Sequence, residues 1–161
     1  MSGPVSVGLG ELAVSSDPGD TLKTYGLGSC IAVVVYDRRR RCGGLLHVVY
    51  PESSSNAQRV ERQPAYFADT GVPLLLRYFA QSGAIDRRDL VIKLVGGANM
   101  MDTEGRFNIG KRNALAVKKA LWGLGLGVHS EDVGGTIGRT VWIEVATGAT
   151  TLANGSRQWQ L

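Results

Sequence analysis

The sequence predicts an α+β domain built on a mixed β-sheet, and three observations support this. Several short apolar segments rich in β-branched residues are typical of strands, and two longer segments carry apolar residues at the helical spacing of three and four. The two kinds of segment do not alternate regularly along the chain. The chain has 161 residues, which suits one domain with a core at about residues 5–152. The polar residues 153–161 are expected to form a flexible tail.

Three of the expected strands lie within the first 50 residues of the chain. Residues 5–14 show alternating apolar positions and predict one strand. Residues 31–36 form a continuous apolar, β-branched run, which is typical of a buried strand. Residues 45–50 return as a second strand, so the two segments are expected to form a hairpin around a charged turn at residues 37–44.

Two helices are expected after this hairpin. Residues 65–81 place apolar side chains on one helical face, and Asn108 is a good N-cap for a second helix that ends near Gly123. The polar residues 52–62 predict a mobile loop. Further strands are expected at residues 90–95, 128–129 and 140–145.

The composition narrows the class of protein. The formal net charge is only +4, and much of it comes from the run Arg38–Arg41, which favours a solvated turn over a patch for an acidic partner. Nucleic-acid binding has weak support, because no aromatic residues accompany these arginines. The start of the chain lacks a charged, apolar leader, and no run of 18 apolar residues occurs. We therefore expect a cytoplasmic protein in which Cys30 and Cys42 are reduced.

Cys30 is the first candidate for chemistry. It follows the small residues Gly26, Gly28 and Ser29 and precedes the buried run. Such a loop can expose a side chain and leave backbone N–H groups free to form an oxyanion hole. Free cysteines are among the most buried residues, however, so spacing alone favours a structural role for Cys30.

A cysteine nucleophile needs a base, and the chain has two histidines. His47 lies in the returning strand of the hairpin, whose pairing would bring it toward Cys30 and allow it to lower the thiol pKa. His129 is expected at the surface. Cys42 is a competing nucleophile, because the neighbouring arginines favour its thiolate, but its turn offers no evident oxyanion hole.

Cofactor sites are poorly supported by the sequence. The cysteines and histidines lack the spacing of a closed zinc site. The glycines before Cys30 lack the last glycine of a dinucleotide-binding motif and lead into a strand instead of a helix. We therefore expect no metal and no organic cofactor.

Several segments resemble the CheD family of chemoreceptor glutamine deamidases. Gly28-Ser29-Cys30 lies six residues after Thr24 and seventeen before His47, which is the active-site pattern of that family. Matching stretches follow in order at residues 44–51, 93–98, 109–113, 132–139 and 147–148. The resemblance covers roughly residues 8 to 150, although residues 48–50 depart from the usual family sequence.

The resemblance implies a fold, a reaction and partners. It implies a sandwich of mixed β-sheet with helices outside, and a triad of Cys30 as nucleophile, His47 as base and Thr24 as the residue that orients His47. Gly28 and Ser29 would form the oxyanion and substrate loop. The implied reaction hydrolyses glutamine side chains of methyl-accepting chemotaxis receptors to glutamate, with no cofactor. The alternatives are a non-catalytic partner and activator of a CheC-type phosphatase, or a receptor methylesterase. A monomer is expected.

Overall fold

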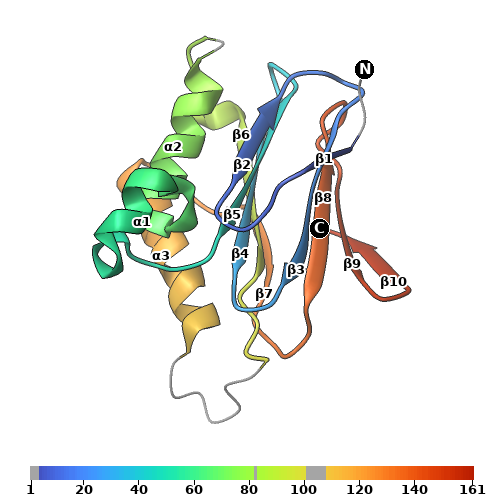
Figure 1. The fold of residues 1–161 in the computed structure, drawn as a ribbon. Coiled ribbons are helices and arrows are strands. Elements are labelled where there is room, and N and C mark those ends of the chain that lie inside the picture. Colours follow the sequence, from blue (N-terminus) through green and yellow to red (C-terminus); the bar gives the residue numbers. More distant parts are fainter. Residues whose placement is uncertain (1–3, 82, 101–107) are drawn as a thin grey trace.

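The computed structural model describes residues 4–81, 83–100 and 108–161. Two five-stranded mixed sheets pack face to face, and helices cover the outer side of one of them (Figure 1). Sheet 1 contains, in spatial order, β1 (Pro4–Ser6), β3 (Thr21–Leu27), β8 (Arg139–Glu144), β9 (Thr150–Asn154) and β10 (Arg157–Gln160). Sheet 2 contains β2 (Leu12–Ser15), β5 (Cys42–Val48), β4 (Ile31–Asp37), β6 (Leu90–Gly96) and β7 (Ser130–Val133). The expected α+β sandwich is confirmed.

Three described helices lie on the outer side of sheet 2, the second and third of them packed against it, and they differ in part from those predicted. They are α1 (Ala57–Arg62), α2 (Ala68–Ala80) and α3 (Ile109–Gly123), with 3₁₀ turns at Ser53–Ser55, Pro64–Tyr66 and Arg87–Asp89. The loop expected at residues 52–62 is wrong, because the Asn56 side chain accepts a bond from the Arg59 amide and caps α1. No helix within the described ranges is long and apolar enough to cross a membrane.

Strand β4 is the centre of sheet 2, and all seven of its residues are buried. Alternation divides its side chains between two cores. Ile31 and Val33 pack toward the helices, whereas Ala32 and Val34 pack between the two sheets. Cys30, immediately before the strand, belongs to the same inter-sheet core. The buried strand is thus confirmed, and it places Cys30 between the sheets.

The single strand expected at residues 5–14 is wrong. The chain turns at Gly10, whose φ of 67° suits glycine, and the Glu11 carboxylate accepts a bond from the Gly8 amide at 2.7 Å. As a result β1 pairs with β3 in sheet 1, while β2 pairs with β5 in sheet 2. Between β1 and β2 the chain crosses from sheet 1 to sheet 2. Val7 lies at the start of this crossing beside β3, and its amide donates to the Lys23 carbonyl at 2.8 Å.

The C-terminal part holds more strand than expected. Strands β6 and β8 match the predictions, but β7 begins only at Ser130, and residues 153–161 are not a flexible tail. They complete β9 and form β10, which pairs with β9 in antiparallel register. Trp159 packs into the inter-sheet core and donates its indole N–H to Asp132 at 2.8 Å. The ladder to β9 and the bond from Trp159 hold this polar edge strand in sheet 1.

Candidate active site

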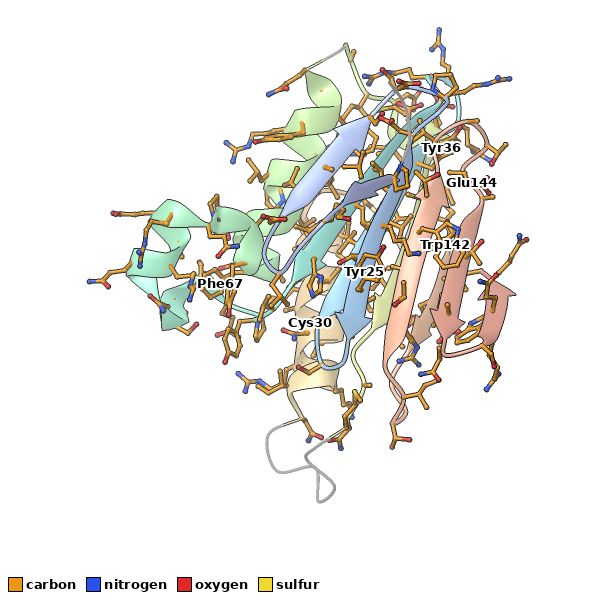
Figure 2. The ribbon with its side chains drawn as sticks, turned by 45° about the vertical axis from the view of Figure 1, so that its right-hand side comes forward. Tyr25, Cys30, Tyr36, Phe67, Trp142 and Glu144 are labelled. Carbon is orange, nitrogen blue, oxygen red and sulfur yellow. The ribbon has the colours of Figure 1, made fainter. Side chains whose placement is uncertain are left out.

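Cys30 and His47 lie on the same face of the β4–β5 hairpin. The antiparallel register pairs His47 with Ala32, and Cys30 lies two residues before Ala32 on the same side. Diagonal neighbours of this kind lie about 7–8 Å apart, with their Cβ atoms somewhat closer, which is within reach of aromatic and long side chains. Figure 2 shows Cys30 at the start of β4, next to the loop that joins it to β3. The predicted hairpin is confirmed, and it brings these two residues to one end of sheet 2.

Thr24 reaches His47 from the opposite sheet. Its hydroxyl oxygen lies 2.7 Å from His47 Nδ1 and 2.6 Å from the Val7 carbonyl oxygen. A carbonyl can only accept, so the single hydroxyl proton of Thr24 goes to Val7. The Thr24 oxygen must then accept a hydrogen bond from His47, so Nδ1 carries the imidazole proton. The three residues therefore fix the tautomer in which Nε2 carries the lone pair.

Val7 was not identified from the sequence. It contributes only its backbone carbonyl, which leaves no signature in the residue type. Its place depends on the chain crossing from sheet 1 to sheet 2, and that crossing was not predicted either.

His47 is held as a neutral imidazole. Its side chain is only 1% exposed, and burial lowers its pKa from 6.5 to about 4. The Nε2 atom is buried and has no hydrogen-bond partner among the described residues. An unpartnered basic nitrogen on the same face of the hairpin as a thiol is an arrangement that suits a general base.

This burial predicts a specific loss of stability in acid. The unfolded chain binds a proton on His47 near pH 6.5, and the folded protein does so only near pH 4. The free energy of unfolding should therefore fall as the pH drops from 6.5 to 4, by up to about 3 kcal/mol. Urea unfolding measured across this range checks it. The His47→Gln variant should lose this part of the slope, and an identical slope in both proteins would contradict the burial of a neutral His47.

Cys30 is also neutral at rest. It is 8% exposed, and burial raises the pKa of its thiol, while a hydrogen bond from its own backbone amide lowers that pKa by a smaller amount. The sequence-based expectation that His47 lowers the thiol pKa is therefore not met in this state. A thiol in this state can act as a nucleophile only if a base takes its proton during the attack.

The loop before Cys30 is pinned to the turn after β6. The Gly97 amide donates to the Cys30 carbonyl and the Ala98 amide donates to the Gly28 carbonyl, both at 2.8 Å. Ser29 between them is half-buried. Within β3, Gly26 has a φ of 65° at a break in the pairing with β8, which turns the chain toward this loop. The glycine loop expected around Gly28 and Ser29 thus holds a fixed position.

The packing of Gly96 against the Cys30 loop leaves no room for a side chain at this position. A Cβ atom at Gly96 would lie 2.2 Å from the Cys30 carbonyl oxygen, and its φ of 117° is strained for any other residue. Gly96→Ala should therefore lower the free energy of unfolding by about 3 kcal/mol or more. Gly127→Ala is the matched control, because a Cβ there meets nothing within 4 Å. Equal stability of the two variants in urea unfolding would contradict the packing of Gly96 on Cys30.

Cys42 does not resemble a nucleophile in the structure. The sequence placed it in an exposed turn, but it is 2% exposed in β5, opposite Asp37. Burial raises the pKa of its thiol, and this outweighs the opposing effect of Arg40. The β-ladder continues for three pairs past Leu45, into the expected turn at residues 37–44, and this draws Cys42 into the helix-facing core.

The other cationic and histidine candidates lie away from Cys30. The run Arg38–Arg41 follows β4, whereas Cys30 precedes it, so the two are at opposite ends of a seven-residue strand. Arg40 donates to the Phe79 carbonyl at 2.9 Å and pairs with Asp37. His129 is exposed, as expected, and its Nδ1 accepts a bond from the Ile92 amide.

No group of three or more His, Cys, Asp or Glu residues that could hold a metal ion occurs in the part of the chain that the structure describes. The arrangement of Cys30, His47 and Thr24 supports acyl-transfer chemistry by a thiol and an imidazole, in which a carbonyl carbon is attacked and its leaving group is protonated.

Comparisons with known proteins show the family of this chain. A family model described as CheD chemotactic sensory transduction matches residues 49–154. A probable chemoreceptor glutamine deamidase CheD of Syntrophotalea carbinolica is 48% identical over 157 residues, which cover 96% of this chain and 97% of that protein. Those of Solibacter usitatus and Thermococcus kodakarensis are 41% and 42% identical, covering 98% and 89% of this chain and 92% and 88% of their own. The family model begins after His47, whereas the relatives span nearly the whole chain.

Proposed function

Because this chain belongs to the CheD family, we propose that it deamidates glutamine side chains of chemoreceptors, with Cys30 as nucleophile and His47 as general base. One observation carries the assignment of roles. The bond between Thr24 and His47 Nδ1 leaves Nε2 buried, unprotonated and unpartnered on the face that also carries Cys30. This is the position from which an imidazole can take the proton of a thiol.

The first half of the proposed reaction forms a thioester. The Cys30 sulfur attacks the carboxamide carbon, and His47 Nε2 takes the thiol proton as the carbon–sulfur bond forms. The electron pair of the carbonyl moves onto its oxygen, and the Cys30 amide, with a neighbour in the Gly28–Ser29 loop, donates to that oxyanion. The imidazolium then gives its proton to the nitrogen, the carbon–nitrogen bond breaks, and ammonia leaves.

The second half restores the thiol. A water molecule attacks the thioester carbon while His47 takes one of its protons, and the carbon–sulfur bond breaks to release glutamate. The proton returns from His47 to the sulfur. Thr24 supports both halves of the reaction. Its oxygen accepts a hydrogen bond from the Nδ1–H of His47 throughout and stabilises the imidazolium each time it forms.

The neutral resting state has a consequence for this mechanism. Burial opposes the charge on both Cys30 and His47, so the separated ions are unfavourable before the substrate is bound. Proton transfer is then coupled to the attack, when the negative charge moves onto an oxygen that backbone amides can hold.

Mass spectrometry of a chemoreceptor cytoplasmic fragment tests the proposed reaction. Each converted glutamine gains about one dalton, whereas hydrolysis of a glutamyl methyl ester removes a methylene. The protein should convert glutamine in the folded fragment and leave an unstructured glutamine-containing peptide unchanged. Loss of methyl groups without any glutamine conversion would identify a methylesterase instead. Unaltered glutamines and methyl esters would leave only a binding role.

Three further expectations stay predictions of the sequence. They are the binding of a CheC-type phosphatase, a cytoplasmic location and a monomeric state.

A further inference from the structure

We infer that Asn113 is a positioning residue that sets the spacing between Cys30 and His47. Its side-chain amide donates to the Ser29 carbonyl at 2.9 Å and to the Val49 carbonyl at 3.0 Å. Ser29 immediately precedes Cys30, and Val49 lies two residues after His47. The inference rests on the proposed function, in which those two residues react together.

The bridge lies where the β-ladder stops. The last backbone pair of the β4–β5 hairpin at this end is Ile31 with Val48, and the next residues belong to neither strand. Beyond it the Val49 amide turns away to donate to the Tyr66 carbonyl at 2.9 Å. The two strands would therefore separate beside Cys30. The two N–H groups of the Asn113 side-chain amide connect the segments that follow them.

Helix α3 delivers Asn113 to this point. Gly110, one turn earlier on the helix, packs so closely that a Cβ there would lie 2.4 Å from the Gly97 carbonyl oxygen. Gly97 and Ala98 are also the residues whose amides hold the Cys30 loop. The helix and the loop are thus fixed against the same turn, and Asn113 closes the arrangement on the β5 side.

The burial of Asn113 lowers the stability of the folded protein. It is 0% exposed, and its Oδ1 atom is buried with no hydrogen-bond partner in the described part of the chain. An unsatisfied buried acceptor costs about 1–3 kcal/mol, and asparagine is a poor residue inside a helix. An apolar side chain could not replace the amide, which donates to two segments that lie 84 and 64 residues before Asn113 in the sequence.

The test compares Asn113→Leu, Asn113→Ser and Tyr36→Phe in the full-length protein. Leucine keeps the branch at Cγ but has no donor, and serine is smaller but keeps one. Tyr36→Phe is the control, because it removes a bond of 2.8 Å to the Val145 carbonyl at the opposite end of β4 from Cys30 (Figure 2). All are assayed well below their melting temperatures for receptor deamidation, and for alkylation of Cys30 by iodoacetamide without receptor, read by peptide mass.

Asn113→Leu should lower kcat by about 10- to 100-fold and leave KM within about threefold, because a misplacement near 1 Å is enough for such a loss. Alkylation of Cys30 at pH 7 should slow to the rate seen in His47→Gln. Asn113→Ser should lie between leucine and wild type, and Tyr36→Phe should match wild type. If Asn113 only filled space, leucine would retain more activity than serine, and that order would overturn the inference.

The two proposals fail differently. Deamidation that survives in Cys30→Ala would refute the proposed function, whereas the alkylation rates would still report the spacing of Cys30 and His47. Asn113 variants with wild-type kcat and alkylation rates, combined with an inactive Cys30→Ala, would refute only the role of Asn113.

Discussion

Replacing Cys30 by alanine is expected to abolish receptor deamidation. The change removes the sulfur that forms the proposed thioester, and the other cysteine, Cys42, belongs to the helix-facing core instead of the His47 face. Nucleophile removal from a hydrolase site commonly costs about 10³-fold or more in kcat. The measurement is the rate of glutamine conversion in a receptor fragment, read by mass spectrometry, with circular dichroism to establish folding.

Cys42→Ala is the matched control for this loss. It also removes a buried sulfur, but at the other end of β5, opposite Asp37. It should lower stability through the small cavity it leaves, while the rate below the melting temperature stays near wild type. Equal losses in the two cysteine variants would point to a structural cause and contradict the role of Cys30.

His47→Gln is expected to lower kcat by about 10²- to 10⁴-fold, the usual contribution of a general base and acid. Glutamine can still donate a bond to Thr24, so the contact between the sheets is kept, but it cannot accept and return a proton. The rate of deamidation at saturating receptor is the measurement. KM should change little, because His47 is buried and acts on the reacting atoms.

His129→Gln serves as the comparison for this second loss. His129 is exposed and contacts the Ile92 amide instead of the site, so its replacement should leave kcat unchanged. A His47→Gln variant with wild-type kcat would show that another group takes the thiol proton.

The hairpin of the candidate site was predictable because its signals are local. The run at residues 31–36 is β-branched and continuous, and only a strand buried on both faces suits it. Once paired with the returning segment, alternation alone places His47 and Cys30 on one face. The run Arg38–Arg41 is close to Cys30 in sequence, but the seven-residue strand β4 separates them in space.

The remaining parts of the site depend on contacts between distant segments. Thr24 contacts His47 across the two sheets, and only the family resemblance pointed to it. Val7 acts through a carbonyl, and Asn113 bridges segments that no periodicity connects to it. Strand β10 was not predicted, because its polar residues fit an edge strand with one solvent-exposed face as well as they fit a loop.

Chemical modification of the wild-type protein tests the central claim most directly, since no residue is replaced. Iodoacetamide should reach Cys30, at 8% exposure, before Cys42, at 2%. Samples taken during the reaction are assayed for receptor deamidation and mapped by peptide mass for both thiols. The account predicts that activity falls in proportion to the fraction of Cys30 modified. Full deamidation activity in protein whose Cys30 is completely alkylated would contradict it.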